Sequence, residues 1–219
     1  MEMEERSSTH GLHHSDSVTT ARIQSLTDGV FAFAMTLLIL NFRTSVDIPS
    51  ESLTQILFAS VPAFSTYFLS FVALGALWVA DQNHFRWITR ADRTFLWINI
   101  FFQSFIALIP VSTALLRSYY ENPLAVVLYG TNLIICGIGL YLQWAYATHR
   151  RRLISDETSE TTIRLMKSRI LVPAMLVILA SLYTFVSSVV SLYMFAVIFA
   201  LAMIPATSDK IIKIIREKL

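Results

Sequence analysis

Residues 22–40 read RIQSLTDGVFAFAMTLLIL, and this stretch decides the fold class. Its length and apolar character suit a helix that crosses a membrane, which needs about 20 predominantly apolar residues. It nevertheless opens with Arg22 and holds a carboxylate, Asp28. A charged group costs about 2.5–3.5 kcal/mol at the centre of a bilayer and less near its surface. Asp28 is therefore a candidate catalytic acid, ion ligand or structural latch, or the N-cap of a helix that begins at Thr27 or Gly29.

The composition of the whole chain favours an integral membrane protein. Of its 219 residues, 55% are hydrophobic and only 15% are charged, and the mean hydropathy is +0.59. A soluble domain carries roughly a quarter charged residues, so this chain has too few polar side chains to cover a water-soluble body. Its length fits one domain. The single cysteine, Cys136, excludes an intrachain disulfide and is expected to pack in an apolar run.

Four further stretches contain no Asp, Glu, Lys or Arg: residues 52–80, 94–116, 122–149 and 170–208. The first three each fit one membrane-spanning helix. The fourth has about twice the length that one helix needs, and predicts two short helices joined by a tight turn. The serines at 187, 188 and 191 mark the expected turn. Together with residues 22–42 this gives an all-α membrane protein with six transmembrane helices.

The positions of Lys and Arg predict the orientation of these helices. All 17 basic residues except Arg43 and Arg117 fall at the two ends of the chain, or in the second-to-third and fourth-to-fifth connections. Cytoplasmic loops carry an excess of Lys and Arg. Six helices with both termini in the cytoplasm place this excess on one side, whereas five helices would put the basic C-terminal tail on the other.

The chain therefore divides into three expected parts. Residues 1–21 form a flexible cytoplasmic tail, polar throughout and without the apolar core of a secretory signal. Residues 22–207 form the six-helix transmembrane domain. Residues 208–219 form a cytoplasmic amphipathic helix, because isoleucines recur there at helical spacing between basic residues.

The first helix has two distinct faces on a helical wheel. Leu26, Phe33, Leu37 and Leu40 form one apolar stripe, flanked by Gly29 and Thr36. Asp28 points about 140° away from Phe33, toward the packing of other helices. The stripe is either an ordinary helix–helix seam or the wall of a pore, in which apolar rings act as constrictions.

Enzyme motifs are absent from the sequence. It contains no glycine-rich phosphate loop and no HExxH, CxxC or GxSxG pattern. We therefore expect no catalytic residue, no cofactor and no metal site. The fragment CGIG at 136–139 is typical of close helix packing through small residues.

Arg22, Leu26, Thr27 and Asp28, followed by GVFAFAMTLLIL, resemble the RxxxFSD signature of the lysosomal and endosomal potassium-channel family, which includes bacterial single-repeat homologues. The family continues this signature as GVFAIAxTLLxL. Residues 85–110, FRWITRADRTFLWINIFFQSFIALIP, resemble its LFRYIxRxDxxLLWLNLLFLxFxxLLP pattern, and Trp78 and TALL at 113–116 match as well. The resemblance covers most of residues 22–116; beyond them only the hydropathy pattern agrees.

The resemblance implies a potassium-permeable channel without the TVGYG filter, which this sequence also lacks. Bacterial members have six helices and form homotetramers in which the first helices line a central pore. One copy of the signature therefore implies a homotetramer in a prokaryotic cell membrane, with lipid and K⁺ as partners and no nucleic acid. By position, the constriction residues are Phe33, Leu37 and Leu40, and Thr36 forms a hydroxyl layer. Arg22, Thr27 and Asp28 form the network that fixes the pore helix, with Trp78, Asp81, Gln82 and His84 as candidate partners.

Three departures from the family pattern affect these expectations. Leu26-Thr27 stands where the family has Phe-Ser, and Phe33 where it has isoleucine or leucine. Asp81 and Gln82 replace paired histidines that contact the signature aspartate, so the latch must be rebuilt through Gln82 or His84. Two alternatives to a potassium channel remain: a proton-coupled transporter that uses Asp28, and a non-conducting scaffold whose first helix lies in a dry seam.

Overall fold

The structure is a computed structural model that describes residues 20–40 and 53–203. The expected C-terminal helix at 208–219 and nearly all of the expected N-terminal tail lie outside these residues. The described part contains six α-helices and one short 3₁₀ turn, η1 (His149–Arg151). The α-helices are α1 (Thr20–Leu40), α2 (Leu53–Phe85), α3 (Arg93–Ser118), α4 (Pro123–Thr148), α5 (Glu160–Tyr183) and α6 (Ser188–Met203).

The helices agree with the all-helical membrane fold predicted from hydropathy. Five of them are long and apolar enough to cross a membrane, and α6 is a shorter apolar helix. The predicted hairpin is found where the serines occur: α5 ends at Tyr183, and Ser188 is the first residue of α6. The Ser191 hydroxyl then donates a 2.6 Å hydrogen bond to the Ala180 carbonyl, which holds the two helices together next to the turn.

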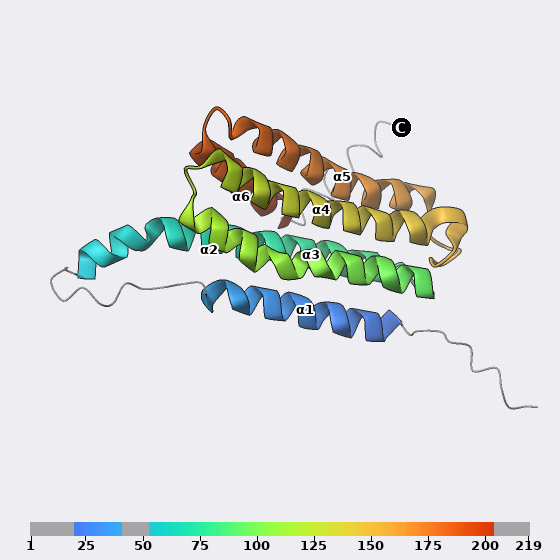
Figure 1. The fold of residues 1–219 in the computed structure, drawn as a ribbon. Coiled ribbons are helices and arrows are strands. Elements are labelled where there is room, and N and C mark those ends of the chain that lie inside the picture. Colours follow the sequence, from blue (N-terminus) through green and yellow to red (C-terminus); the bar gives the residue numbers. More distant parts are fainter. Residues whose placement is uncertain (1–19, 41–52, 204–219) are drawn as a thin grey trace, which may run out of the picture.

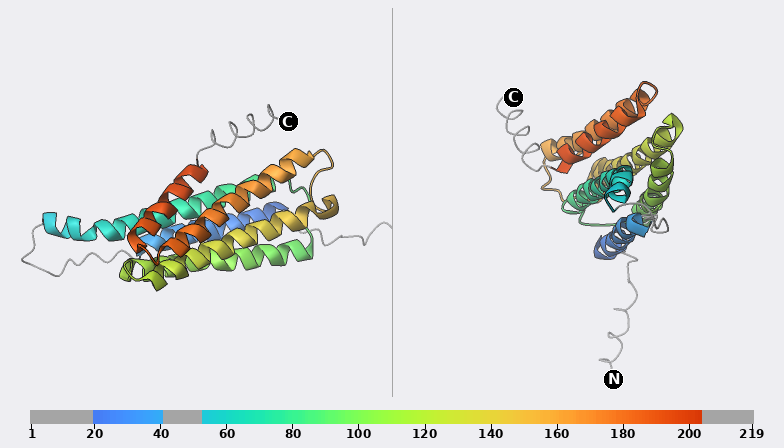
Figure 2. Two further views of the ribbon diagram at one scale, coloured as in Figure 1. Left: turned by 90° about the horizontal axis from the view of Figure 1, so that it is seen from above. Right: turned by 90° about the vertical axis from the view of Figure 1, so that its left-hand side faces the viewer.

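The helices form an elongated bundle in which α1 lies at one edge (Figure 1). α1 packs mainly on α3 and α2, while α4 packs on α3 and α5. The end-on view in Figure 2 places α5 and α6 on the side opposite α1. α1 therefore has neighbours along only part of its circumference, and the rest of its surface is free in a single subunit.

Close approach between α3 and α4 depends on one glycine. A Cβ atom at Gly139 would lie 2.9 Å from the Phe102 side chain and 3.3 Å from its Cα atom. Phe102 in turn contacts Phe31 of α1, with ring centroids 6.0 Å apart. The small-residue packing predicted for CGIG is confirmed at this glycine, which lets α3 and α4 pack closely against each other.

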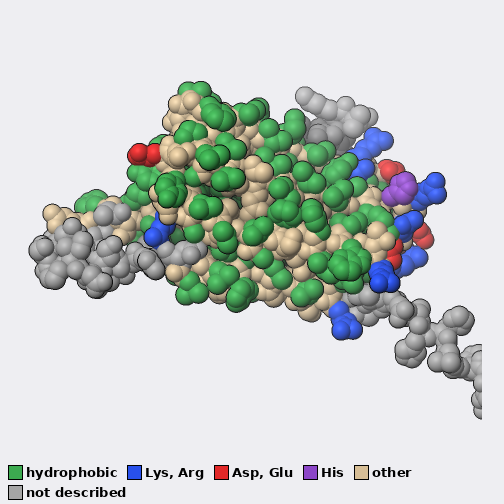
Figure 3. Space-filling view, viewed as in Figure 1, with side chains coloured by type: hydrophobic (Ala, Val, Ile, Leu, Met, Phe, Trp, Pro, Cys, Tyr) green, Lys and Arg blue, Asp and Glu red, His purple; other side chains and the backbone are tan. Residues whose placement is uncertain are grey.

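One end of the bundle collects the basic residues. Figure 3 shows Lys and Arg side chains gathered at the end where α2, α4 and η1 finish, beside a flank that is largely hydrophobic. Backbone hydrogen bonds join the two connections at this end: Thr89 N donates to the Leu153 carbonyl over 2.9 Å, and Ile88 pairs with Ile154. We refer to this region as the basic end.

Candidate pore helix and its anchoring network

The two faces of α1 are separated in the structure. The side chains buried against α2 and α3 are Ile23, Thr27, Phe31, Ala34 and Leu38. The exposed face includes Leu26, Gly29, Phe33, Thr36 and Leu40. Because α1 packs through the first set, the apolar stripe found on the helical wheel is the face that the subunit leaves uncovered.

The four expected pore residues are not equally exposed. Phe33 and Leu40 expose 64% and 74% of their surface, whereas Leu37 is half-buried at the edge of the stripe. Thr36 is exposed, and its hydroxyl donates to the Phe33 carbonyl over 2.8 Å. Since a hydroxyl that donates one hydrogen bond keeps oxygen lone pairs free, this oxygen can still coordinate a cation.

Asp28 is held by α2. Its Oδ1 atom accepts hydrogen bonds from Trp78 Nε1 at 2.8 Å and from Gln82 Nε2 at 2.7 Å. Trp78 and Gln82 are four residues apart and therefore share one face of α2. In the single subunit Asp28 is exposed rather than buried, because it lies at the rim of the α1–α2 contact.

Thr27 forms a second anchor, to α3, which the sequence analysis did not identify. Its hydroxyl is buried, accepts a hydrogen bond from Gln103 Nε2 at 2.7 Å, and lies 3.3 Å from Asn99 Oδ1. Asn99 and Gln103 are neighbours one turn apart on α3 and also hydrogen-bond to each other. We call Thr27, Asn99 and Gln103 the α1–α3 clasp. Their polarity inside an otherwise apolar span was the signal that could have revealed it.

The remaining candidates of the predicted network make no hydrogen bond or ion pair with Asp28. The Arg22 side chain is exposed and makes no hydrogen bond or ion pair with the other residues that the structure describes. Asp81 and His84 are buried, and His84 stacks on Trp144 of α4. Neither Asp81 oxygen, nor Nδ1 of His84, has a hydrogen-bond partner within residues 20–40 and 53–203. Of the two replacements considered for the family's histidines, Gln82 contacts Asp28 and His84 does not.

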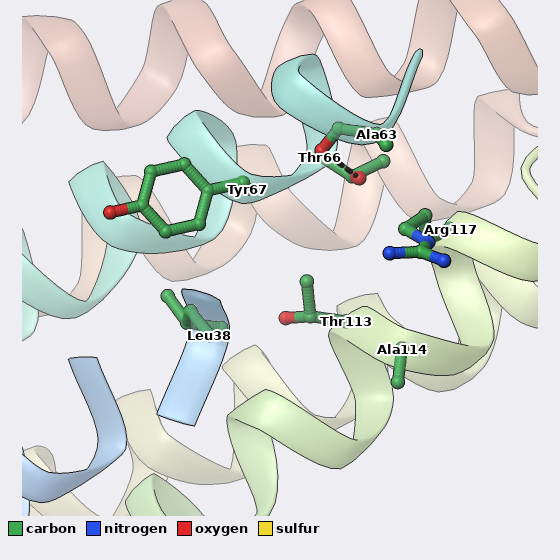
Figure 4. Close-up of a pocket in the computed structure, with 7 residues that line it drawn as sticks. All are labelled: Leu38, Ala63, Thr66, Tyr67, Thr113, Ala114 and Arg117. Atoms are coloured by element: carbon green, nitrogen blue, oxygen red, sulfur yellow. Dashed lines mark hydrogen bonds between the residues drawn. The ribbon is translucent and has the colours of Figure 1, made fainter. Parts of the chain in front are cut away.

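A hollow beside α1 is too small for a ligand. Figure 4 shows Leu38 of α1 facing Tyr67 of α2 and Thr113 of α3, with Arg117 at its edge. The cavity measures about 10 Å³, which suits a single water molecule. Among the described residues, no group of three or more His, Cys, Asp and Glu side chains is placed to hold a metal ion.

These features define a class: a multi-pass helical membrane protein whose first helix is anchored on one face and uncovered on the other. The sequence model of the family described as the endosomal/lysosomal potassium channel TMEM175 matches residues 22–110. Residues 22–110 are therefore similar to the TMEM175 family. The matched family is a family of ion channels.

Individual relatives support this placement. A potassium channel of Streptomyces collinus is 26% identical over 154 residues, which cover 68% of this chain and 75% of the relative. A potassium channel of Chamaesiphon minutus is 28% identical over 143 residues, covering 63% and 70%. The endosomal/lysosomal proton channel TMEM175 of Gallus gallus is 31% identical over 122 residues, which are 52% of this chain but only 24% of that protein.

A solved structure confirms the fold. The crystal structure of a lysosomal potassium-selective channel TMEM175 homolog from Chamaesiphon minutus matches with a TM-score of 0.73. The match covers 84% of this chain and 98% of that one, at 23% sequence identity. The six-helix arrangement is therefore the TMEM175 fold.

Proposed function

We propose that this chain is one subunit of a homotetrameric, potassium-permeable channel in which four α1 helices surround the pore. The uncovered face of α1 is the main support, because an apolar stripe with one hydroxyl is what an axial helix would present to an ion path. The bacterial relatives named as potassium channels support K⁺ as the permeant ion. The basic end faces the cytoplasm, so both chain termini lie on that side.

Phe33, Leu37 and Leu40 form apolar constrictions in this channel. Hydrophobic rings gate by dewetting, and four phenylalanines at one level would narrow a pore more than smaller side chains do. Thr36 lies between the levels of Phe33 and Leu40 and replaces part of the ion's hydration shell with its hydroxyl oxygen. Leu37 is half-buried in the subunit and contributes at the edge of the constriction.

Asp28 acts as a latch rather than an ion ligand. Its Oδ1 atom already accepts two hydrogen bonds from α2, and the clasp at Thr27 holds the neighbouring face of α1 on α3. Anchors on two sides fix the rotation of α1, and this rotation decides which side chains face the axis. Arg22, which lies about one and two-thirds turns before Asp28, has its place at the cytoplasmic rim.

Flux measurements on reconstituted protein test this function. Liposomes loaded with K⁺ should release it along its gradient when they contain the purified chain, with less release of Na⁺ under the same gradient. Currents in planar bilayers should increase linearly with voltage. Saturating transport that requires a proton gradient would instead identify a coupled transporter, and absence of flux from correctly assembled protein would indicate a scaffold.

A further inference from the structure

We propose that the basic end holds a binding site for one anionic phospholipid, formed by Arg90, Arg93 and Arg152 and continued along the outer face of α3. This inference does not depend on ion conduction. It rests on how three arginines are brought together, and on the apolar surface that begins next to them.

Two connections that are far apart in the sequence supply the arginines. The backbone N–H of Arg90 donates to the Leu153 carbonyl over 3.3 Å, which places Arg90 beside the segment that carries Arg152. Arg93 is the first residue of α3 and directly follows its N-cap, Asp92. All three arginine side chains are exposed. The fold therefore gathers them at one corner of the basic end.

Tyr146 fixes the position of Arg152 in this corner. The Arg152 guanidinium donates a 2.7 Å hydrogen bond to the Tyr146 hydroxyl and lies 5.1 Å from the centroid of its ring. The Tyr146 hydroxyl in turn donates to Asp92 Oδ2 over 2.8 Å. Asp92 Oδ1 accepts from the backbone of Phe95, so both oxygens of this carboxylate are occupied.

The corner keeps a net positive charge for a ligand. Within the described chain, Asp92 is the only carboxylate joined to this cluster by hydrogen bonds, through Tyr146. Its one negative charge faces the three positive charges of the arginines. The guanidinium groups of Arg90 and Arg93 make no hydrogen bond or ion pair with other described residues. Guanidinium groups bind phosphate through paired N–H donors, so the site suits a phosphate group.

The surface of α3 next to the arginines is exposed and largely apolar, and this favours a phosphate group that belongs to a lipid. Residues 93, 97, 101, 104 and 108 follow the spacing of one helix face and are all exposed. Trp97, which is 61% exposed, lies about one turn after Arg93 along α3. Phe101 and Leu108 lie further along the same exposed face. Tryptophan favours the level of the lipid headgroups, and the deeper side chains suit an acyl chain. A soluble polyanion would contact the arginines alone and leave this apolar face uncovered.

The test compares lipid retention by two variants that lose the same charge. The full chain is reconstituted in phosphatidylcholine nanodiscs that contain phosphatidylglycerol, and is then transferred to detergent. Phosphatidylglycerol retained per subunit is measured by native mass spectrometry. Arg90→Gln/Arg93→Gln removes two charges from the proposed site. Arg164→Gln/Lys167→Gln removes two charges from α5, near the same end but outside the site.

We expect the site variant to lose phosphatidylglycerol retention by about tenfold and the control variant by less than about twofold. Equal losses in the two variants would mean that only the general charge of this end attracts lipid, which overturns the proposal. Unchanged retention in the site variant would overturn it as well. Dissociation of the assembly by the site variant, with retention unchanged, would assign this face to contacts between copies of the chain.

Discussion

The side-chain amide of Gln82 donates a hydrogen bond of 2.7 Å to Oδ1 of Asp28, across the contact between α2 and α1. The family pattern that the sequence resembles has a histidine at this position. A neutral amide does not titrate near pH 7, whereas an imidazole does. Substitution by Gln82 therefore keeps the contact to Asp28 and removes one titratable group from it.

Asp28→Asn should weaken the assembly before it changes ion preference. The substitution replaces an ionised acceptor by a neutral amide, and hydrogen bonds to charged groups contribute about 1.5–3 kcal/mol each. We expect a lower melting temperature and less tetramer in size-exclusion chromatography, with the same preference for K⁺ over Na⁺ in the remaining channels. Asp156→Asn, at an exposed loop residue, is the matched control. A stable assembly with altered ion preference would place Asp28 in the ion path.

The sequence predicted the helices well because bilayer thickness fixes the length of an uncharged apolar stretch. Even the turn between α5 and α6 was marked by serines inside a stretch too long for one helix. The clasp was not predicted, because hydropathy does not reveal which side of α3 faces α1. Asn99 and Gln103 could have been noticed as polar residues at helical spacing within residues 94–116, but their partner Thr27 follows only from the packing angle between the helices.

Thr27→Val should destabilise the subunit, and Thr27→Ser should not. Valine keeps the shape of threonine but removes the oxygen that accepts from Gln103 Nε2. Interhelical hydrogen bonds in membranes contribute about 0.6 kcal/mol on average and up to about 1.7. We expect Thr27→Val to lower the free energy of unfolding by an amount in this range, measured by thermal unfolding in detergent. Serine restores the hydroxyl, so an equal loss in Thr27→Ser would show that the methyl group, rather than the clasp, is what matters.

Phe33→Ala should increase single-channel conductance by about threefold or more, and Leu37→Ala by less, because hydrophobic constrictions limit the hydration of a pore. The larger increase is expected for Phe33→Ala because Phe33 is uncovered in the subunit, whereas Leu37 is half-buried. Selectivity for K⁺ over Na⁺ should fall in the same variants. The control is Phe185→Ala, since Phe185 is 73% exposed but lies at the turn after α5. Unchanged currents in Phe33→Ala would remove this side chain from the pore wall.

Thr36→Val should reduce the preference for K⁺ over Na⁺, while Thr36→Ser should preserve it. Valine has nearly the shape of threonine but no oxygen to replace a water of the ion's hydration shell. The hydroxyl already donates to the Phe33 carbonyl, so its lone pairs are the groups available to a cation. Reversal potentials under mixed K⁺ and Na⁺ gradients measure the effect. The hydroxyl layer would be disproved by equal selectivity in the valine variant and the native chain.

Gly139→Ala should destabilise the bundle by about 1–3 kcal/mol, the usual cost of forcing a methyl group into a packed interior. The new Cβ atom would lie 2.9 Å from the Phe102 side chain, and the backbone of α3 at 3.3 Å limits how far that ring can retreat. Because Phe102 also contacts Phe31, the shift would reach the pore helix and lower K⁺ flux together with stability. Gly137→Ala is the matched control on the same helix, since its Cβ atom would meet Ala174 at an ordinary 3.6 Å. Thermal unfolding and liposome flux are measured on both variants. Equal stability and equal flux in Gly139→Ala and Gly137→Ala would refute the tight contact at Gly139.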